Sequence, residues 1–148
     1  MFSGNQEQKL DDRGRLRLPA KFRGELGKSF AITKGHDNML IIYSQEEFQQ
    51  ICEKMSKYDQ YDLELQRAVS DYISGFEQLE EDAQGRFVIP PKMRAYAGID
   101  KNVYIKGVLK RIEIMSLEKH QSEEAKLDPN QLMNIFNRAD KAMVAQNG

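Results

Sequence analysis

The sequence has few of the residues that build disulfide frameworks and membrane spans. Its 148 residues include one cysteine, Cys52, two histidines and no tryptophan. A single cysteine cannot form a disulfide within its own chain, which agrees with a reducing compartment. No apolar run approaches the roughly 18 residues of a membrane span, and the stretch MFSGNQEQK is too polar for a signal peptide. We therefore expect a cytoplasmic protein with no membrane partner.

Motifs for common catalytic chemistry are missing as well. Neither G-x-x-x-x-G-K-[ST] nor G-x-G-x-x-G occurs, and His36 and His120 have no second ligand at metal-binding spacing. Cys52 falls on an apolar helical stripe, where a thiol usually acts as a small hydrophobic group. An enzyme that depends on Cys52 is the weakest hypothesis, because no base is expected near the thiol. The sequence predicts no catalytic residue, no metal, no cofactor and no small-molecule substrate.

What the sequence does have is an uneven distribution of charge. The formal net charge is −1, yet residues 13–28 hold six basic residues and one acidic residue, whereas residues 44–81 hold ten acidic and three basic residues. A local basic patch attracts a polyanion even on a neutral molecule, because salt screens charges beyond a Debye length of about 8 Å. The length fits one compact domain or two closely packed halves.

The chain also repeats itself. A shift of 71 residues places DDRGRLRLPAKFRGELG (11–27) on DAQGRFVIPPKMRAYAG (82–98), and a shift of 72 places AITKG (31–35) on VYIKG (103–107). A unit of about 50 residues therefore occurs twice, which is too few copies for a solenoid of ~3 or more repeats. Two copies predict a closed pair of halves related by pseudo-symmetry.

Each unit is predicted to fold as two strands followed by a short helix. The Asp at the first position and the Gly at the fourth position of DDRG and DAQG favour a type I turn with a bulge, which joins the two strands as a hairpin. After the turn polar and apolar residues alternate, as in a half-buried strand, and Pro19 or Pro90 ends the strand. A short helical turn closed by Gly27 or Gly98 follows. Further strands are expected at residues 30–34, 39–43, 102–106 and 111–115.

Apolar residues at helical spacing predict three more helices. The first follows Ser44 as N-cap, with Glu47 as capping-box partner, and the second runs roughly from Tyr61 to Tyr72. The third begins with the cap Asp128 and with Pro129 at the first helical position. Its apolar stripe needs a partner, which is either the protein's own core or a neighbouring subunit. The expected organisation is a first repeat at 1–58, a connecting helix at 59–72, a second repeat at 73–126 and a C-terminal helical extension at 127–148.

The two turns carry the strongest functional signal. Arg13, Arg15 and Arg17 lie two residues apart, so all three can project from one face of a two-stranded ribbon, which fits the DNA major groove. Arginine is also the residue that reads guanine with two hydrogen bonds. A charged strand edge that prevents aggregation explains one such turn equally well. The duplication favours two equivalent contact points, although a turn kept for folding would also retain Gly14 and Gly85.

The aspartates of the turns have a structural interpretation. Asp11 and Asp82 can accept backbone N–H groups at the head of the turn and can pair with Arg15 or Arg86 to orient the guanidinium. No second carboxylate, histidine or metal partner recurs beside them. We therefore expect turn formation and orientation from these carboxylates, and no catalysis.

The twin D-x-x-x-R motifs, Asp11–Arg15 and Asp82–Arg86, each followed by a short strand and a proline, resemble the MraZ family of bacterial transcription regulators. The opening MFSG and the spacing between the motifs are also similar, and only the tail after about Lys126 lies outside the resemblance. The resemblance implies an α+β fold in which duplicated ββα units form a pseudo-two-fold, double-split, swapped-hairpin β barrel related to AbrB and MazE. It also implies ring-shaped homo-oligomers, association with the nucleoid, and binding to short G-rich direct repeats in the promoter of the protein's own division and cell wall operon, usually with repression.

By position, the resemblance assigns the DNA contacts of the two motifs to Arg15 and Arg86. Turn geometry adds Arg13 and Gln84, each two residues earlier. Val88 stands where the first repeat has an arginine, so the two halves cannot present identical charge. The expected DNA-binding residues are Arg13, Arg15, Arg17, Lys21, Gln84, Arg86 and Lys92, and the expected turn-orienting residues are Asp11, Gly14, Asp82 and Gly85.

The leading hypothesis is a non-enzymatic repressor that binds double-stranded promoter DNA in a sequence-specific manner. Each arginine contributes about 1 to 3 kcal/mol of base discrimination, and several modules of a ring gain affinity through their effective concentration on adjacent sites. The alternative is an antitoxin-like protein-binding module of the same fold that holds a partner with its terminal helix. Co-purification of a stoichiometric second protein without DNA would favour this alternative.

Overall fold

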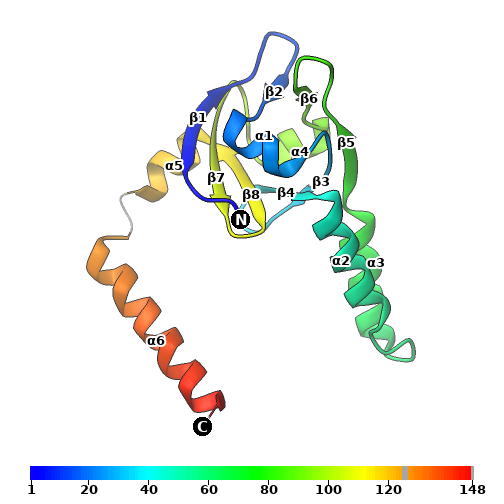
Figure 1. Ribbon diagram of the computed structural model, residues 1–148, viewed down its shortest axis with the longest axis vertical. Coiled ribbons are helices and arrows are strands. Elements are labelled where there is room, and N and C mark those ends of the chain that lie inside the picture. Colours follow the sequence, from blue (N-terminus) through cyan, green and yellow to red (C-terminus); the bar gives the residue numbers. More distant parts are fainter. Residues whose placement is uncertain (125–126, 148) are drawn as a thin grey trace. The chain divides into compact units, whose positions relative to one another are not determined.

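The computed structural model describes residues 1–124 and 127–147. The chain divides into two compact units, Met1–Leu117 and Glu118–Gly148, and the first unit contains both repeats. Figure 1 shows the helices and strands along the chain. The strands are β1 (Asn5–Lys9), β2 (Arg15–Arg17), β3 (Ser29–Lys34), β4 (Leu40–Ser44), β5 (Glu77–Glu80), β6 (Arg86–Val88), β7 (Asn102–Val108) and β8 (Arg111–Ser116). The helices are α1 (Ala20–Leu26), α2 (Gln45–Ser56), α3 (Leu63–Ser74), α4 (Pro91–Tyr96), α5 (Leu117–Glu124) and α6 (Pro129–Asn147).

The strands exchange partners between the two repeats. In the six-stranded sheet, of order β1-β7-β8-β4-β3-β5, β1 of the first repeat pairs with β7 of the second, and β5 of the second pairs with β3 of the first. The strands that flank each turn therefore do not form the plain hairpin that the turn residues suggest. β2 and β6 instead pair with each other as a separate ribbon. These elements confirm the α+β class and the duplicated, swapped ββα units.

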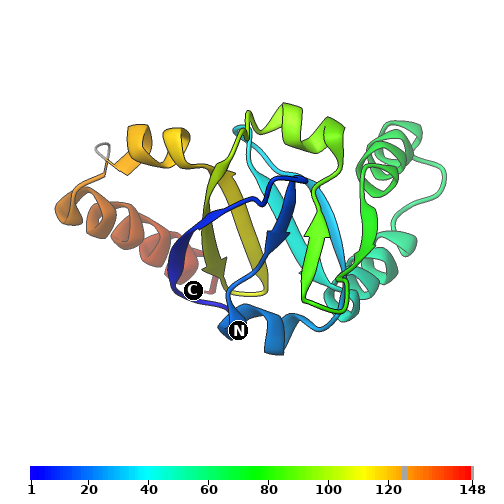
Figure 2. The same ribbon diagram turned by 90° about the horizontal axis from the view of Figure 1, so that it is seen from above.

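Backbone pairing among the described residues does not close the strands into a barrel. β1 and β5 end the order of the six-stranded sheet, and the β2–β6 ribbon lies between them without joining either ladder (Figure 2). The expected barrel is therefore open in its hydrogen bonding. β2 and β6 have only three residues each, and each pairs only with the other.

A pseudo-two-fold axis follows from the strand registers. In the ribbon, Leu16 pairs with Phe87, its own equivalent 71 residues later. Between β4 and β8, Ile41 pairs with Glu113, its equivalent 72 residues later. A residue can pair with its own copy only where the symmetry axis passes between the two strands. The axis therefore runs through both strand pairs, and the two repeats lie around it.

One hydrophobic core serves both repeats. We call the segments that follow the two turns, residues 15–19 and 86–90, the first and second arms. The apolar positions of both arms are buried, which confirms the expected alternation: Leu16 and Leu18 in the first, Phe87 and Ile89 in the second. The ring of Phe87 packs edge-on against Phe30, with the ring centroids 5.0 Å apart. Neither repeat can bury its apolar arm without the other, since each arm lies in a core built from both.

Helices α2 and α3 form an antiparallel pair beside the sheet (Figure 1). Ser44 caps α2 as expected, accepting a hydrogen bond from the backbone N–H of Glu47 at 3.1 Å. Helix α3 begins two residues later than predicted, because the Asp62 carboxylate accepts the N–H of Leu65 at 3.1 Å and acts as N-cap. Tyr43 of β4 lies next to Tyr72 of α3. Burial is the main cause that raises the pKa of Tyr43 to about 12, and Tyr72 raises this pKa further.

The C-terminal helix α6 begins with a capping box. Asp128 Oδ1 accepts the N–H of Gln131 at 2.8 Å, and Gln131 Oε1 accepts the N–H of Asp128 at 3.0 Å. The predicted cap Asp128 and first helical residue Pro129 are confirmed. Apolar side chains of the predicted stripe are exposed, among them Leu132 and Phe136. The boundaries expected between the repeats, the connecting helix and the extension stay a prediction.

Candidate nucleic-acid interface

The first turn, residues 11–15, is built around one carboxylate. Asp11 Oδ1 accepts the backbone N–H groups of Arg13 at 2.9 Å and of Arg15 at 2.8 Å. The N–H of Gly14 donates to the carbonyl oxygen of Asp11 at 3.0 Å, and Gly14 has φ +73°. The aspartate thus binds the backbone on both sides of the turn, and a left-handed glycine completes it.

The second turn, residues 82–86, repeats this arrangement atom by atom. Asp82 Oδ1 accepts the N–H groups of Gln84 and Arg86, both at 2.9 Å. Gly85 donates to the carbonyl oxygen of Asp82 at 2.9 Å and has φ +77°. The two turns differ in sequence at two of their five positions and share Asp, Gly and Arg at the other three. Their common geometry therefore depends on the carboxylate, the glycine and the backbone N–H of the arginine.

Each aspartate also orients an arginine side chain. The Nε of Arg15 donates to Asp11 Oδ2 at 2.7 Å, and the Nε of Arg86 donates to Asp82 Oδ2 at 3.1 Å. The side chains of Arg15 and Arg86 are 25% and 27% exposed, so they lie along the turns and do not extend freely into solvent. Because Nε binds the carboxylate, the terminal Nη groups are the donors that each guanidinium has left for further partners.

The carboxylates of Asp11 and Asp82 are held in their charged form. The backbone N–H of Arg15 is the largest cause that lowers the pKa of Asp11 below its ordinary value, and the backbone N–H of Arg86 does the same to the pKa of Asp82. A second ion pair crosses the axis, with Nη1 of Arg86 3.9 Å from Asp11 Oδ2. The charges of the two turns therefore form one connected group.

The β2–β6 ribbon brings further predicted residues to one face. Arg15 pairs with Val88 and Arg17 with Arg86, and the alternating positions Leu16 and Phe87 are buried beneath them. Arg17 is exposed, and Val88 is 52% exposed. Both turns lie at the same end of the first unit (Figure 1), with Arg13 and Gln84 exposed. One face of the ribbon thus presents three arginines and one valine.

The two predicted lysines lie elsewhere. Lys21 is exposed on α1, with its Nζ 5.1 Å from the ring centroid of Phe22. Lys92 is exposed on α4 and lines a surface pocket with Asp71 and Glu77. The structure therefore places Lys21 and Lys92 on helices, apart from the outer face of the ribbon.

Sequence reasoning missed two arginines that pack on the turns. Arg23 of α1 lies against Gly85, and Arg94 of α4 lies against Gly14. The signal that could have found them is the repeat itself, because Arg23 and Arg94 are equivalent under the shift of 71 residues. The repeat shows that both positions hold arginine, but it does not show which turn each arginine reaches.

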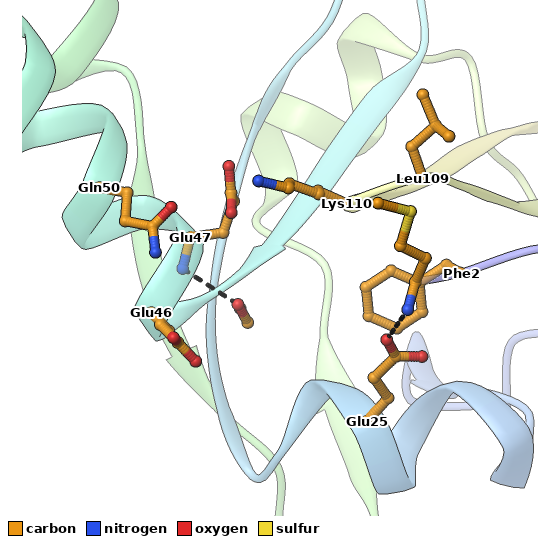
Figure 3. Close-up of a pocket in the computed structure, with 9 residues that line it drawn as sticks. Phe2, Glu25, Glu46, Glu47, Gln50, Leu109 and Lys110 are labelled. Atoms are coloured by element: carbon orange, nitrogen blue, oxygen red, sulfur yellow. Dashed lines mark hydrogen bonds and ion pairs between the residues drawn. The ribbon is translucent and has the colours of Figure 1, made fainter.

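A pocket of about 290 Å³ lies near the N-terminus (Figure 3). The N-terminal amino group pairs with Glu25 at its edge, and the side chains of Glu46, Glu47 and Lys110 also line it. Carboxylates outnumber cations in this lining, which disfavours a phosphate ligand. This pocket is therefore not part of the arginine face.

The residues expected to lack catalytic roles lie on segments other than the two turns. Cys52 is partly buried on α2, and His36 lies exposed between β3 and β4. Across residues 1–124 and 127–147, no three side chains of His, Cys, Asp or Glu gather as a group that could hold a metal ion. In the same ranges, no helix is both long enough and apolar enough to cross a membrane.

Fold and site together define a duplicated, swapped-hairpin α+β protein whose first unit presents two matching Asp–Arg turns at one end. The family model described as "MraZ protein, putative antitoxin-like" matches residues 1–68 and 73–143. The chain belongs to the MraZ family, as its motifs indicate. The match reaches into α6, so the tail after Lys126 does not lie outside the family as the motifs alone suggest.

Relatives agree with this assignment. A protein of Syntrophomonas wolfei named "Transcriptional regulator MraZ" is 44% identical over 119 residues, which cover 80% of this chain and 83% of the relative. A protein of the same name from Finegoldia magna is 38% identical over 142 residues, which cover 95% of this chain and 99% of the relative. The similarity therefore spans both repeats and most of the extension.

Proposed function

We propose that this protein is a non-enzymatic transcriptional regulator that binds double-stranded DNA sequence-specifically through its two turns and the β2–β6 ribbon. The observation that carries the proposal is the pair of carboxylate-oriented arginines, Arg15 and Arg86, joined by the ribbon at one end of the first unit. The name of the relatives, transcriptional regulator, supports the regulatory role.

The chemistry of the two arginines suits guanine. The Nε of each side chain donates to its aspartate. The two Nη groups of each guanidinium are its remaining donors for a ligand. Two parallel donors match the O6 and N7 acceptors of guanine in the major groove, which admits a two-stranded ribbon. A pair of such contacts accounts for recognition of short G-rich repeats.

The finer parts of the proposal concern the target and the assembly. The protein would bind direct repeats in the promoter of its own division and cell wall operon and repress it, at the nucleoid in the cytoplasm. Two arginines discriminate by only about 1 to 3 kcal/mol each. Ring-shaped homo-oligomers would raise the affinity, because neighbouring modules bind adjacent repeats at high effective concentration.

The first prediction tests the two arginines directly. Arg15→Ala and Arg86→Ala should each weaken binding to a duplex with G-rich direct repeats by about tenfold, within the range for one bidentate contact, and leave oligomer size unchanged. Fluorescence anisotropy with the repeat duplex and a scrambled duplex measures the effect. Arg67→Ala, an exposed arginine on α3, is the matched control and should leave both affinities unchanged.

The result that overturns the proposal is equally specific. If Arg15→Ala and Arg86→Ala together leave the affinity for the repeat duplex as it is in the unmodified protein, the turns do not read DNA. If the unmodified protein binds neither duplex at low salt, the DNA-binding role itself is wrong, because phosphate attraction is strongest there.

The second candidate function is an antitoxin-like protein-binding module. The observation that favours it is the exposed apolar stripe of α6, in which Phe136 is 52% exposed and Met143 is 59% exposed. If a protein partner binds to this stripe, replacing both residues by serine should abolish that binding. A purified protein that holds a stoichiometric partner through α6 and binds no DNA would support this function over the first.

A further inference from the structure

Each turn is covered by an arginine from the opposite repeat. A Cβ at Gly14 would lie 2.7 Å from Nη1 of Arg94, which belongs to the second repeat. A Cβ at Gly85 would lie 2.8 Å from Nε of Arg23, which belongs to the first repeat, and still closer to the rest of that guanidinium. The two glycines therefore leave room for a guanidinium as well as adopting positive φ.

The contact at the second turn includes an ion pair. Arg23 Nε lies 3.3 Å from Glu81 Oε2, and Arg23 Nη2 lies 3.4 Å from Glu81 Oε1, so the guanidinium and the carboxylate meet through two pairs of atoms. The side chains are 24% and 10% exposed. Glu81 directly precedes Asp82. Helix α1 of the first repeat is thus bound to the base of the turn that carries Arg86.

The contact at the first turn is chemically different. Arg94 Nε donates to the carbonyl oxygen of Ile99 at 3.1 Å, and Arg94 Nη2 donates to that of Asp100, both in its own repeat. The equivalent of Glu81 in the first repeat is Leu10, which is buried in the core and whose side chain offers no acceptor. Arg94 therefore covers the first turn by packing against Gly14, without the ion pair that Arg23 forms.

We propose that Arg23 and Arg94 are positioning residues for the two DNA-contact turns, each acting on the turn of the opposite repeat, and that the Arg23–Glu81 ion pair fixes the second turn more firmly than the first. This inference rests on the proposed function. A turn fixed before binding loses less conformational freedom when it meets DNA, so its arginine discriminates bases better. The first turn, which lacks such an ion pair, is less constrained and adjusts its conformation when its own arginine meets DNA.

A direct phosphate contact by Arg23 is the competing explanation, and it has a different signature. Removing a phosphate contact lowers the slope of log K against log salt by about 1 and weakens all duplexes equally. Removing a positioning residue leaves this slope unchanged and lowers the preference for the repeat duplex. The pairing of Arg23 with a mostly buried carboxylate favours the positioning role, because its charge is already compensated.

The first experiment measures the turns without DNA. A nitroxide spin label is placed at Ala83 of the second turn, or at the equivalent Asp12 of the first, by cysteine substitution in a Cys52→Ser background; both sites are exposed. Arg23→Ala should increase the mobility of the label at 83 and leave that at 12 unchanged, and Arg94→Ala should do the reverse. Circular dichroism confirms that each variant is folded.

The outcome of this experiment does not depend on DNA recognition. If Arg23→Ala mobilises both labels equally, or mobilises neither, the opposite-repeat positioning is wrong even where DNA binding holds. If the labels respond as expected and no duplex is bound, the positioning stands and the proposed function fails. In the unmodified protein the label at 83 should also be less mobile than the label at 12, and the reverse order would overturn the ranking of the two turns.

The second experiment removes the ion pair while keeping its shape. Glu81→Gln should lower the ratio of affinities for repeat and scrambled duplexes by about fivefold, the lower end for one bidentate arginine, with the salt slope unchanged. Glu80→Gln, its exposed neighbour on β5, is the matched control and should leave the ratio unchanged. Tighter binding of Glu81→Gln to both duplexes with an unchanged ratio would show that Arg23 contacts phosphate, and the proposal would fall.

Discussion

The carboxylates of Asp11 and Asp82 link the shape of the turns to pH. Each carboxylate accepts hydrogen bonds from two backbone N–H groups and from one arginine Nε, and these bonds stabilise its charged form. The folded state therefore lowers the pKa of both groups below the ordinary value of 3.8. A lowered pKa adds stability that is fully present above pH 3.8 and is lost as the pH falls below it.

This dependence gives the second prediction. The double variant Asp11→Asn/Asp82→Asn should be less stable than the unmodified protein at pH 7, and the difference should shrink as the pH falls below 3.8. Urea unfolding at pH 7, 4 and 3 measures it. A stability difference that stays constant down to pH 3 would contradict the assigned role of the two charges.

Gly85 gives the third prediction, also at the scale of one residue. Gly85 and Gly98 both have positive φ, +77° and +61°, but a Cβ meets Arg23 only at Gly85 and meets nothing within 4 Å at Gly98. Gly98→Ala should cost about 1 kcal/mol, the strain of a left-handed residue. Gly85→Ala should cost more, because its Cβ also displaces the guanidinium from Glu81.

A double-mutant cycle separates the two parts of this cost. In an Arg23→Ala background, the destabilisation by Gly85→Ala should fall to that of Gly98→Ala, since only the backbone strain is left. Urea unfolding of the four proteins provides the comparison. If Gly85→Ala costs the same with and without the Arg23 side chain, then the guanidinium does not occupy the space above this glycine.

At the scale of the elements, the turns could be predicted from the sequence and the pairing of their strands could not. Asp and Gly at fixed positions specify the turn, and the alternation after it shows that Leu16 and Phe87 face the core. Alternation determines which face is buried but not which strand lies alongside. The exchange of β1 and β5 between repeats follows from the family resemblance and is absent from the local pattern.

The candidate site shows the same limit. The spacing of Asp11 and Arg15 identifies a short-range pair, because four residues around a turn bring the two side chains together. Arg23 and Glu81 lie 58 positions apart in sequence and meet only because the repeats fold around a common axis. Sequence reasoning therefore names the residues of each turn and misses the arginine that covers it from the opposite repeat.

The α2–α3 pair gives the fourth prediction. Phe76 packs against Phe48, Tyr72 and Tyr43, with ring centroids 4.7, 5.1 and 6.1 Å away. Phe76→Ala should destabilise the protein by about 2 kcal/mol, below the range for fully buried phenylalanine because Phe76 is half-buried. Amide exchange in α2 and α3 should accelerate, with the turns unaffected.

The control for this prediction is another aromatic residue of the same segment. Tyr61 is 91% exposed in the connection between the two helices, so Tyr61→Ala should change the free energy of unfolding by less than about 0.5 kcal/mol. Exchange that accelerates equally in the turns and in the helices would show that the pair is not a separate packing unit.

The whole molecule combines a symmetric frame with an asymmetric arginine face. The axis relates Arg15 to Arg86, but it relates Arg17 to Val88, so the first arm carries one more positive charge on the ribbon. Exposed guanidinium groups beside a base-reading arginine mainly attract phosphate, which is independent of sequence. Under the proposed function, we therefore expect the two ends of the ribbon to differ in attraction for the DNA backbone more than in base reading.

Restoring the symmetry provides the fifth prediction. Val88→Arg should tighten binding to repeat and scrambled duplexes by the same factor and steepen the slope of log K against log salt by about 1, the value for one added phosphate contact. Val88→Thr, which keeps the branched shape without a charge, is the matched control and should change neither affinity. Arg17→Val should reduce the salt slope by the same amount. If Val88→Arg tightens binding to the repeat duplex alone, the outer end of β6 lies against bases, and the base-reading surface extends beyond the two turns.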